Sequence, residues 1–301
     1  MSVTVSEQEY GNFGKCVFLD NGKVRLGVTV DHGPRIIYFS LCGKKNIMFE
    51  DAERTFTEPA GEYGTWVNYG GHRLWCSPEV NPETYYPDNA PVAYSVQGNK
   101  ATFTPPVTAF GKQFSITVVM DDEKPVVNVS HSIKNVSGKT SKFAAWAITG
   151  LTIGGVCKIP VSTKKTGYLA NRVLSLWDYT DVNDPRLSPG NSEIRIRQDI
   201  YKKNPIKIGI NADDVFGAYA VNGQIFVKTT APYDADAVYP DFSCNFEVYT
   251  NSRFLEMENI GIMKEFADGE TAEISEKWIL LDNADDNEPE LDNIEKAVKA
   301  L

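Results

Sequence analysis

A period of two residues, rather than 3.6, dominates the hydrophobic pattern of this chain. Strand-like runs rich in Val, Ile, Thr, Tyr and Phe recur along it, and Gly, Asn, Asp and Pro separate them. These runs span residues 24–30, 35–41, 114–120, 126–133, 206–211, 217–221 and 224–230. Many short strands in one chain predict an all-β fold, either a large sandwich or a barrel.

A tight hairpin is expected where the last two runs meet. The dipeptide Asn222-Gly223 separates them, and Asn-Gly favours the positive φ angles of a two-residue β-hairpin turn. We therefore predict a hairpin over about residues 217–230. Because side chains alternate along a strand, Lys228 should point the same way as Phe226 from its second strand.

Only the end of the chain shows a clear helical pattern. Leu291, Ile294, Val298 and Leu301 share one face of a 3.6-residue period, and Pro289 suits the first turn. The polar segment 282–288 before them has the composition of a linker. We expect an all-β domain over residues 1–285 and an amphipathic helix over 286–301 that either packs on the domain or trails from it.

The charge of the chain narrows the class of partner. The formal net charge is -10 and the pI is about 4.9, so a nucleic-acid partner, which needs clustered Lys and Arg, is not expected. The chain begins without a basic and apolar leader, and no stretch approaches the length of a membrane span. We expect a cytoplasmic protein with no membrane partner.

Cysteine and histidine usage argues against a metal or disulfide framework. The five cysteines are scattered and odd in number, which indicates free thiols in a reducing compartment. The three histidines are also far apart in sequence, and no zinc-type spacing, Walker A loop, GxSxG or HExxH motif is present. We expect no metal site.

The densest group of polar and aromatic residues lies in a stretch with little periodicity, residues 50–95. There, His72 stands between Gly71 and Arg73, and Trp75 follows. We predict a loop for this segment, and loops of this length in compact domains are often functional. The alternative for His72 is a structural histidine within a tight turn.

Three segments, in order, resemble the galactose mutarotase (aldose 1-epimerase) superfamily. They are residues 19–49, the segment NYGGHRLWCSPE at 68–79, and residues 246–280. The segment at 68–79 resembles the Gly-Gly-His-Arg-Leu-Trp segment of a divergent bacterial branch of that superfamily. The resemblance implies a large antiparallel β-supersandwich, followed here by the short C-terminal helix, with a sugar site on a concave sheet face.

The resemblance also implies an activity, the interconversion of sugar anomers. A base removes the proton of the anomeric hydroxyl and an acid protonates the ring oxygen. Phe254-Leu255-Glu256 matches the family strand that carries the base, and His72 is the candidate acid. Strand alternation places Glu258 on the same face as Glu256, where two carboxyls push their pKa values apart. The alternative is a solvent-facing pair of glutamates.

Further residues are candidates for holding the sugar. Arg73 and Glu79 would form hydrogen bonds with the hydroxyl groups of the sugar, unless they pair with each other. Trp66, Tyr69, Trp75 and Trp146 would stack on a sugar ring, although buried aromatic residues are common.

Two more candidates carry weaker signals. Glu247 would border the site. Lys228 would meet a phosphate or an acidic sugar, unless it is a solvated surface lysine.

One departure from the family pattern concerns Trp146. The segment 146–151 aligns best with a family segment that carries a second histidine, and an indole cannot act as an acid.

We expect the partner to be a small-molecule sugar, and three functions stay open for the protein. The first is an aldose 1-epimerase-like isomerase that needs no cofactor, because side chains can make both proton transfers. The second is a non-catalytic carbohydrate-binding protein. The third is a lyase or isomerase acting on an acidic sugar. A monomer and a homodimer are both compatible with the sequence.

Overall fold

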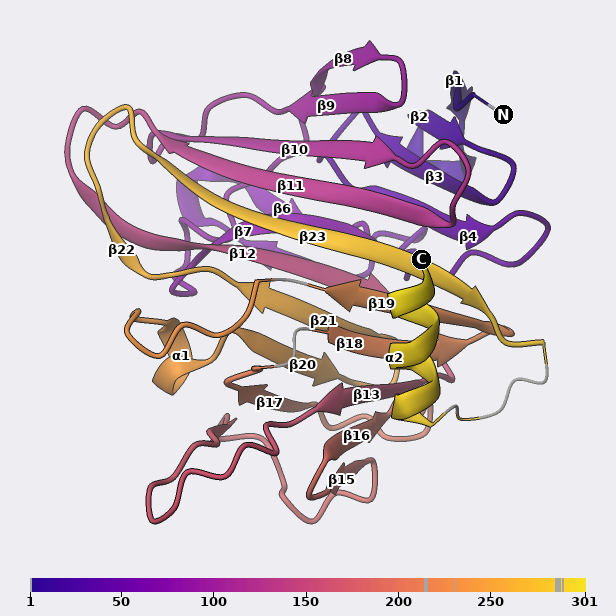
Figure 1. Cartoon of the computed structure of the whole chain (residues 1–301). Coiled ribbons are helices and arrows are strands. Elements are labelled where there is room, and N and C mark those ends of the chain that lie inside the picture. The colour runs from indigo at the N-terminus through magenta and orange to yellow at the C-terminus, as the bar shows by residue number, and fades with distance from the viewer. Residues whose placement is uncertain (1, 214–215, 230, 285–287, 289) are drawn as a thin grey trace.

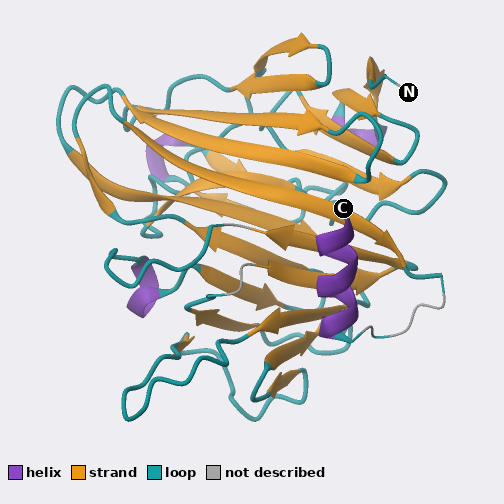
Figure 2. Ribbon diagram, in the orientation of Figure 1, coloured by secondary structure: helices purple, strands orange, loops and turns teal. Residues whose placement is uncertain are grey.

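The structure, a computed structural model, describes residues 2–213, 216–229, 231–284, 288 and 290–301. Two large antiparallel sheets face each other across the molecule, as Figures 1 and 2 show. In the described residues, eleven strands form the first sheet. Their order is β1 (Thr4–Glu9), β2 (Lys15–Asp20), β3 (Val24–Thr29), β4 (Ile36–Leu41), β7 (His72–Ser77), β12 (Ser141–Leu151), β21 (Leu255–Ile260), β20 (Phe246–Thr250), β17 (Ile206–Ile210) and β14 (Leu174–Leu176), with β22 (Lys264–Phe266) beside β12.

Ten strands of the described chain form the second sheet. Their order is β15 (Leu187–Pro189), β16 (Glu193–Arg197), β13 (Val156–Pro160), β18 (Phe216–Val221), β19 (Gln224–Thr229), β23 (Thr271–Asp282), β11 (Val126–Asn135), β10 (Lys112–Met120), β9 (Lys100–Thr104) and β8 (Ala93–Gln97). A separate small hairpin joins β5 (Thr57–Pro59) to β6 (Thr65–Val67). The remaining elements are the short segments η1 (Gly11–Phe13), η2 (Gly61–Tyr63) and α1 (Pro240–Ser243) and the helix α2 (Leu291–Ala300). The prediction of an all-β antiparallel sandwich with a short C-terminal helix is confirmed.

The strands predicted from the period of two are present. Each of the seven runs coincides with a strand, in order β3, β4, β10, β11, β17, β18 and β19. The predicted hairpin is confirmed over the described residues, with β18 paired antiparallel to β19. Asn222 and Gly223 have φ angles of 53° and 68°, as a turn of this kind requires. Residue 230 lies outside the described residues.

The prediction of a loop around His72 is wrong, because residues 72–77 form β7 in the middle of the first sheet. Every residue of β7 is buried, so the strand shows no apolar–polar alternation. Gly71, just before it, has a φ of 65°, and a Cβ there would lie 2.3 Å from the carbonyl oxygen of Ile36. The glycine thus permits the close approach of β4 to the start of β7.

The hydrophobic core lies between the two sheets, and the C-terminal helix covers the outer face of the second. Leu291 and Ile294 of α2 pack with apolar residues of β18, β19 and β23, and Figure 1 shows α2 lying across these strands. The helix therefore packs on the domain and does not trail from it. Pro289, predicted in its first turn, lies outside the described residues.

Two further observations concern the helices and the cysteines. In the described part of the chain, no helix has the length and apolar character of a membrane span. Cys16, Cys42, Cys76, Cys157 and Cys244 are all free thiols.

Candidate functional site

One face of the first sheet forms the floor of a cavity of about 380 Å³. Five neighbouring strands contribute alternate residues to it, because every second side chain of a strand points to the same face. From β7 to β17 these residues are Arg73, Trp75, Trp146, Ile148, Glu256, Glu258, Tyr249 and Lys207.

The register of the sheet explains why residues far apart in sequence meet. Arg73 lies opposite Ile148, and Ile148 lies opposite Glu258. In the next row Glu256 lies opposite Tyr249, which in turn lies opposite Lys207. The rows place two carboxylates and two cations side by side on the floor of the cavity.

The first charged pair joins β7 to β21. Arg73 Nη1 donates a hydrogen bond of 2.9 Å to Glu256, and both residues are buried. The guanidinium carbon of Arg73 lies 4.1 Å from the centre of the Trp75 ring. Burial raises the pKa of Glu256, and the nearby Glu258 raises it further, whereas Arg73 opposes the shift. Glu256 is thus a carboxyl group whose protonation is sensitive to its partners.

The second charged cluster centres on Lys207. Its Nζ lies 2.9 Å from Glu258 Oε2 and 2.7 Å from Glu247 Oε2. Trp146 Nε1 donates a 2.8 Å hydrogen bond to the same oxygen of Glu258. Burial disfavours the charge of Lys207, but the two carboxylates outweigh it and raise the pKa of Lys207. Burial also raises the pKa of Glu247 well above its usual range.

Indole rings form much of the cavity wall. Trp66 lies 5.0 Å from Trp75 and Trp75 lies 5.5 Å from Trp146, measured between ring centres. On the other side, Lys207 Nζ lies 4.6 Å from the centre of the Trp177 ring. Trp66 comes from the small β5–β6 hairpin and Trp177 from the segment after β14. Flat aromatic faces beside charged hydrogen-bonding groups suit a ligand with apolar faces and polar edges.

The structure brings six of the ten predicted site residues to this cavity. Arg73, Trp75, Glu79, Trp146, Glu256 and Glu258 all line it. The other four do not: His72, Tyr69, Glu247 and Lys228. Glu79 accepts a hydrogen bond from the Tyr85 hydroxyl and not from Arg73.

The predicted meeting of His72 and Glu256 across one pocket does not occur. Arg73 points into the cavity, so strand alternation turns its neighbour His72 to the space between the sheets. There, His72 Nδ1 lies 2.9 Å from Thr149 Oγ1, and its Nε2 lies 2.7 Å from His131 Nε2. Burial lowers the pKa of His72 well below its usual range. The ring is therefore neutral, and its geometry is that of a structural histidine.

Lys228 contacts neither a ligand site nor solvent, so both interpretations of it are corrected. Its side chain is fully buried between the sheets, pointing the same way as Phe226. Tyr69 also lies elsewhere, with its ring centre 3.8 Å from that of His32. Glu247 shares a sheet face with Tyr249 but does not line the cavity, and its Oε2 lies 2.7 Å from Lys207 Nζ.

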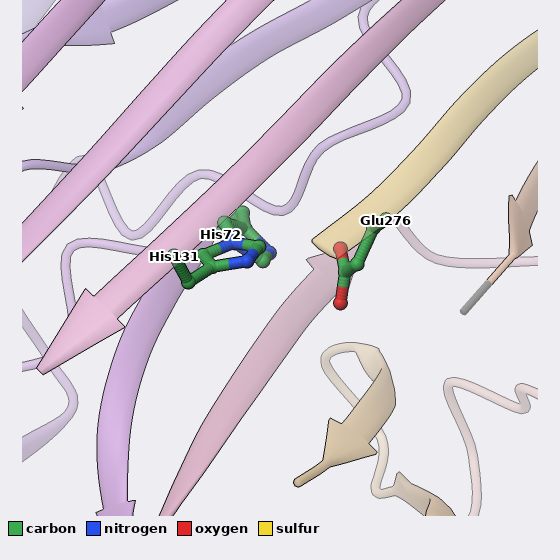
Figure 3. A group of neighbouring side chains, drawn as sticks. All are labelled: His72, His131 and Glu276. Atoms are coloured by element: carbon green, nitrogen blue, oxygen red, sulfur yellow. The ribbon is translucent and has the colours of Figure 1, made fainter. Parts of the chain in front are cut away.

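The described residues contain one group with the composition of a metal site, formed by His72, His131 and Glu276 (Figure 3). Their donor atoms lie within 4.8 Å of one another, so two of the histidines that are distant in sequence do converge. However, Asn259 and Trp278 donate hydrogen bonds to the two oxygens of Glu276. The donor set is thus occupied by a hydrogen-bonded network and does not fit a metal ion.

Sequence reasoning missed several cavity residues, of which Lys207 is the most important. A signal for it existed, because Lys207 is the one charged residue among Ile206, Ile208 and Ile210 in a strand whose residues are all buried. Such a lysine must have a specific partner. Trp177 comes from an irregular segment that carries no comparable signal.

Comparison with known proteins supports the fold. No family model and no curated protein sequence matches the chain. A galactose mutarotase-like protein from Lactobacillus casei has a TM-score of 0.58 at 10% identity, over 88% of this chain and 100% of that one. A candidate aldose 1-epimerase from Escherichia coli has a TM-score of 0.59 at 9% identity, over 93% and 99%.

A third similar structure is part of a longer protein. A TPR-domain containing protein from Parabacteroides distasonis has a TM-score of 0.63 at 14% identity, and the match covers 92% of this chain but only 48% of that protein. At these identities the comparisons show the fold alone. The chain has the galactose mutarotase-like sandwich fold.

Proposed function

We propose that this chain, with its galactose mutarotase-like fold, binds an uncharged sugar in the cavity of the first sheet. The observation that carries the proposal is the combination of indole faces with the ion pairs of Arg73 and Lys207 in one cavity. Aromatic faces stack on the C–H faces of a sugar ring, while charged groups bind its hydroxyl groups strongly. Proteins named for galactose mutarotase and aldose 1-epimerase activity share the fold.

The charges of the cavity favour an uncharged ligand over an acidic one. Arg73 is already paired with Glu256, and Lys207 is paired with both Glu258 and Glu247. Among the described residues, the Nε donor of Arg73 has no hydrogen-bond partner, and a neutral hydroxyl can accept from it. The charge of each lining cation is already balanced by a carboxylate, and an anionic sugar would also meet the surplus of glutamates. An action on acidic sugars therefore has little support.

Anomer interconversion is the second candidate, and Glu256 favours it. A carboxyl whose pKa burial raises from its usual value is suited to general base catalysis near neutral pH. No histidine stands among the described residues that line the cavity, so the acid half of the reaction lacks its expected donor. For this reason we place binding ahead of catalysis.

Calorimetry across a panel of neutral, amino and acidic sugars tests the proposal. We expect neutral sugars to bind, acidic sugars to bind at least tenfold more weakly, and Glu256→Gln to weaken binding. Glu9→Gln, an exposed carboxylate on the outer strand β1, is the control and should bind as wild type. Exchange NMR on the bound sugar then tests catalysis. Binding of no sugar, or equal affinity for Glu256→Gln and wild type, would contradict the proposal.

A further inference from the structure

Lys228 connects the two sheets directly beneath the cavity floor. It belongs to β19 of the second sheet, and its side chain is fully buried. Its Nζ donates hydrogen bonds to the carbonyl oxygens of Ala147 and Met257, at 3.0 and 2.9 Å, and to Thr149 Oγ1 at 2.9 Å. All three acceptors belong to the first sheet, on β12 and β21.

These acceptors are neighbours of the residues that line the cavity. Met257 stands between Glu256 and Glu258, and Ala147 follows Trp146. One ammonium group therefore holds the two strands that carry the carboxylates and the indole, from the side opposite the cavity. The contact adds a side-chain link to the backbone pairing of β12 with β21.

The geometry suits the charged form of Lys228. Besides the three hydrogen-bond acceptors, Glu276 Oε1 lies 3.1 Å from Nζ. An ammonium group has three protons and no lone pair, whereas a neutral amine would direct its lone pair at an acceptor. Burial lowers the pKa of Lys228, and Glu276 opposes this shift. Lys228 and Glu276 thus form a buried ion pair in the core.

The hydrogen bonds around Lys228 extend to two neighbouring histidines and define their protonation. The carbonyl oxygen of Ile274 can only accept, so His131 Nδ1 donates to it and Nε2 of the neutral His131 ring is an acceptor. His72 Nε2 therefore donates to His131 Nε2, and His72 Nδ1 accepts from the Thr149 hydroxyl. Both rings are neutral in this chain of bonds, so they add no charge beside Lys228.

We propose that Lys228 is a positioning residue for the cavity, which fixes β12 against β21 and favours the ionised form of Glu256 through its charge. The cavity side of Glu256 presents Arg73 from β7, Lys207 from β17, Tyr249 from β20 and Glu258 from its own strand. Lys228 acts from the opposite side of the same sheet. The consequence for ligand binding rests on the proposed sugar function, whereas the effect on Glu256 does not.

Carbon-13 NMR titration of the glutamate carboxyls tests this in the protein without ligand. Glu256→Gln identifies the resonance of Glu256. In Lys228→Met and Lys228→Gln, we expect the pKa of Glu256 to rise by about one unit, since each variant removes a buried positive charge that is hydrogen-bonded to the carbonyl of Met257, next to Glu256. Lys228→Arg keeps the charge and should leave the pKa near its wild-type value. The Gln side chain retains hydrogen-bond donors, so this variant serves where Lys228→Met does not fold.

A merely structural role predicts a different result. The melting temperature would then fall in the variants, while the pKa of Glu256 stayed as in wild type, and that outcome would overturn the proposal. Failure of the sugar function is distinguishable. If no sugar binds but the Glu256 titration moves, the inference about Lys228 holds and the proposed function fails. If a sugar binds with the same pH midpoint in Lys228→Gln and wild type, the inference fails.

Discussion

Removal of the Arg73 guanidinium should lower the free energy of unfolding by a large and pH-dependent amount, whose size follows from the structure. Arg73→Met keeps much of the side-chain volume and deletes the charge. Arg73 Nη1 lies 2.9 Å from Glu256 Oε1, and the side chains of Arg73 and Glu256 are only 5% and 10% exposed. Two unit charges about 4 Å apart attract by about 4 kcal/mol at an effective dielectric constant of about 20. Breaking a buried pair costs about 3–5 kcal/mol, because the remaining charge has no partner.

The size of this loss depends on whether Glu256 is ionised. Burial already raises the pKa of Glu256, and removal of Arg73 should raise it further. A carboxyl with a raised pKa in the folded state keeps its proton at low pH without penalty, and stability is lost as the pH rises through that pKa. Arg73→Met should therefore have a lower free energy of unfolding at pH ~8 than at pH ~6.

A double-mutant cycle in urea measures this directly, using wild type, Arg73→Met, Glu256→Gln and the double variant at both pH values. We expect a coupling energy of about 2–4 kcal/mol at the higher pH and a smaller one at the lower pH. The matched control is the exposed pair of Lys299 and Glu295, whose side chains are 77% and 35% exposed. Its coupling should be about 0.5 kcal/mol or less. A value as small for Arg73 and Glu256 would refute the reasoning.

Three further predictions concern Trp146, Gly71 and the buried histidines. Trp146→Phe removes the N–H bonded to Glu258, and calorimetry should show sugar affinity about tenfold or more lower. Gly71→Ala places a Cβ 2.3 Å from a backbone oxygen and should lower the free energy of unfolding by about 2 kcal/mol or more. In Gly138→Ala, also at positive φ but with open space around it, the loss should be about 1 kcal/mol in the same urea assay. Burial lowers the pKa of His32 to about 4 and that of His72 and His131 as well, so stability should fall as the pH drops below about 6.5, and His32→Asn should reduce that fall.

The two-residue hydrophobic period and the turn residues predicted the strands with a clear apolar pattern. They did not predict β7. In β7, His72 and Arg73 are both buried because each has a partner on another strand, Thr149 and Glu256 respectively. Such partners come from tertiary pairing, and no local pattern reveals them. Without the strand assignment, alternation could not show that Arg73, and not His72, faces the cavity.

The same limit applies to the two buried lysines. Both Lys207 and Lys228 lie in apolar strand-like runs, so their local sequence patterns do not distinguish them. Which one borders the cavity depends on the sheet it joins and on the face it occupies, and both are set by long-range pairing. Glu256 and Glu258 could be placed on one face because their strand follows simple alternation.

The most direct test of a sugar site on this sheet uses the five tryptophans of the chain. Trp66, Trp75, Trp146 and Trp177 line the cavity, whereas Trp278 is fully buried in the core. In a titration with a neutral sugar followed by nitrogen-15 NMR of the indole groups, the cavity signals should shift while that of Trp278 stays in place. If none of the four cavity signals shifts at saturating sugar, or if Trp278 shifts as much as they do, the account is contradicted.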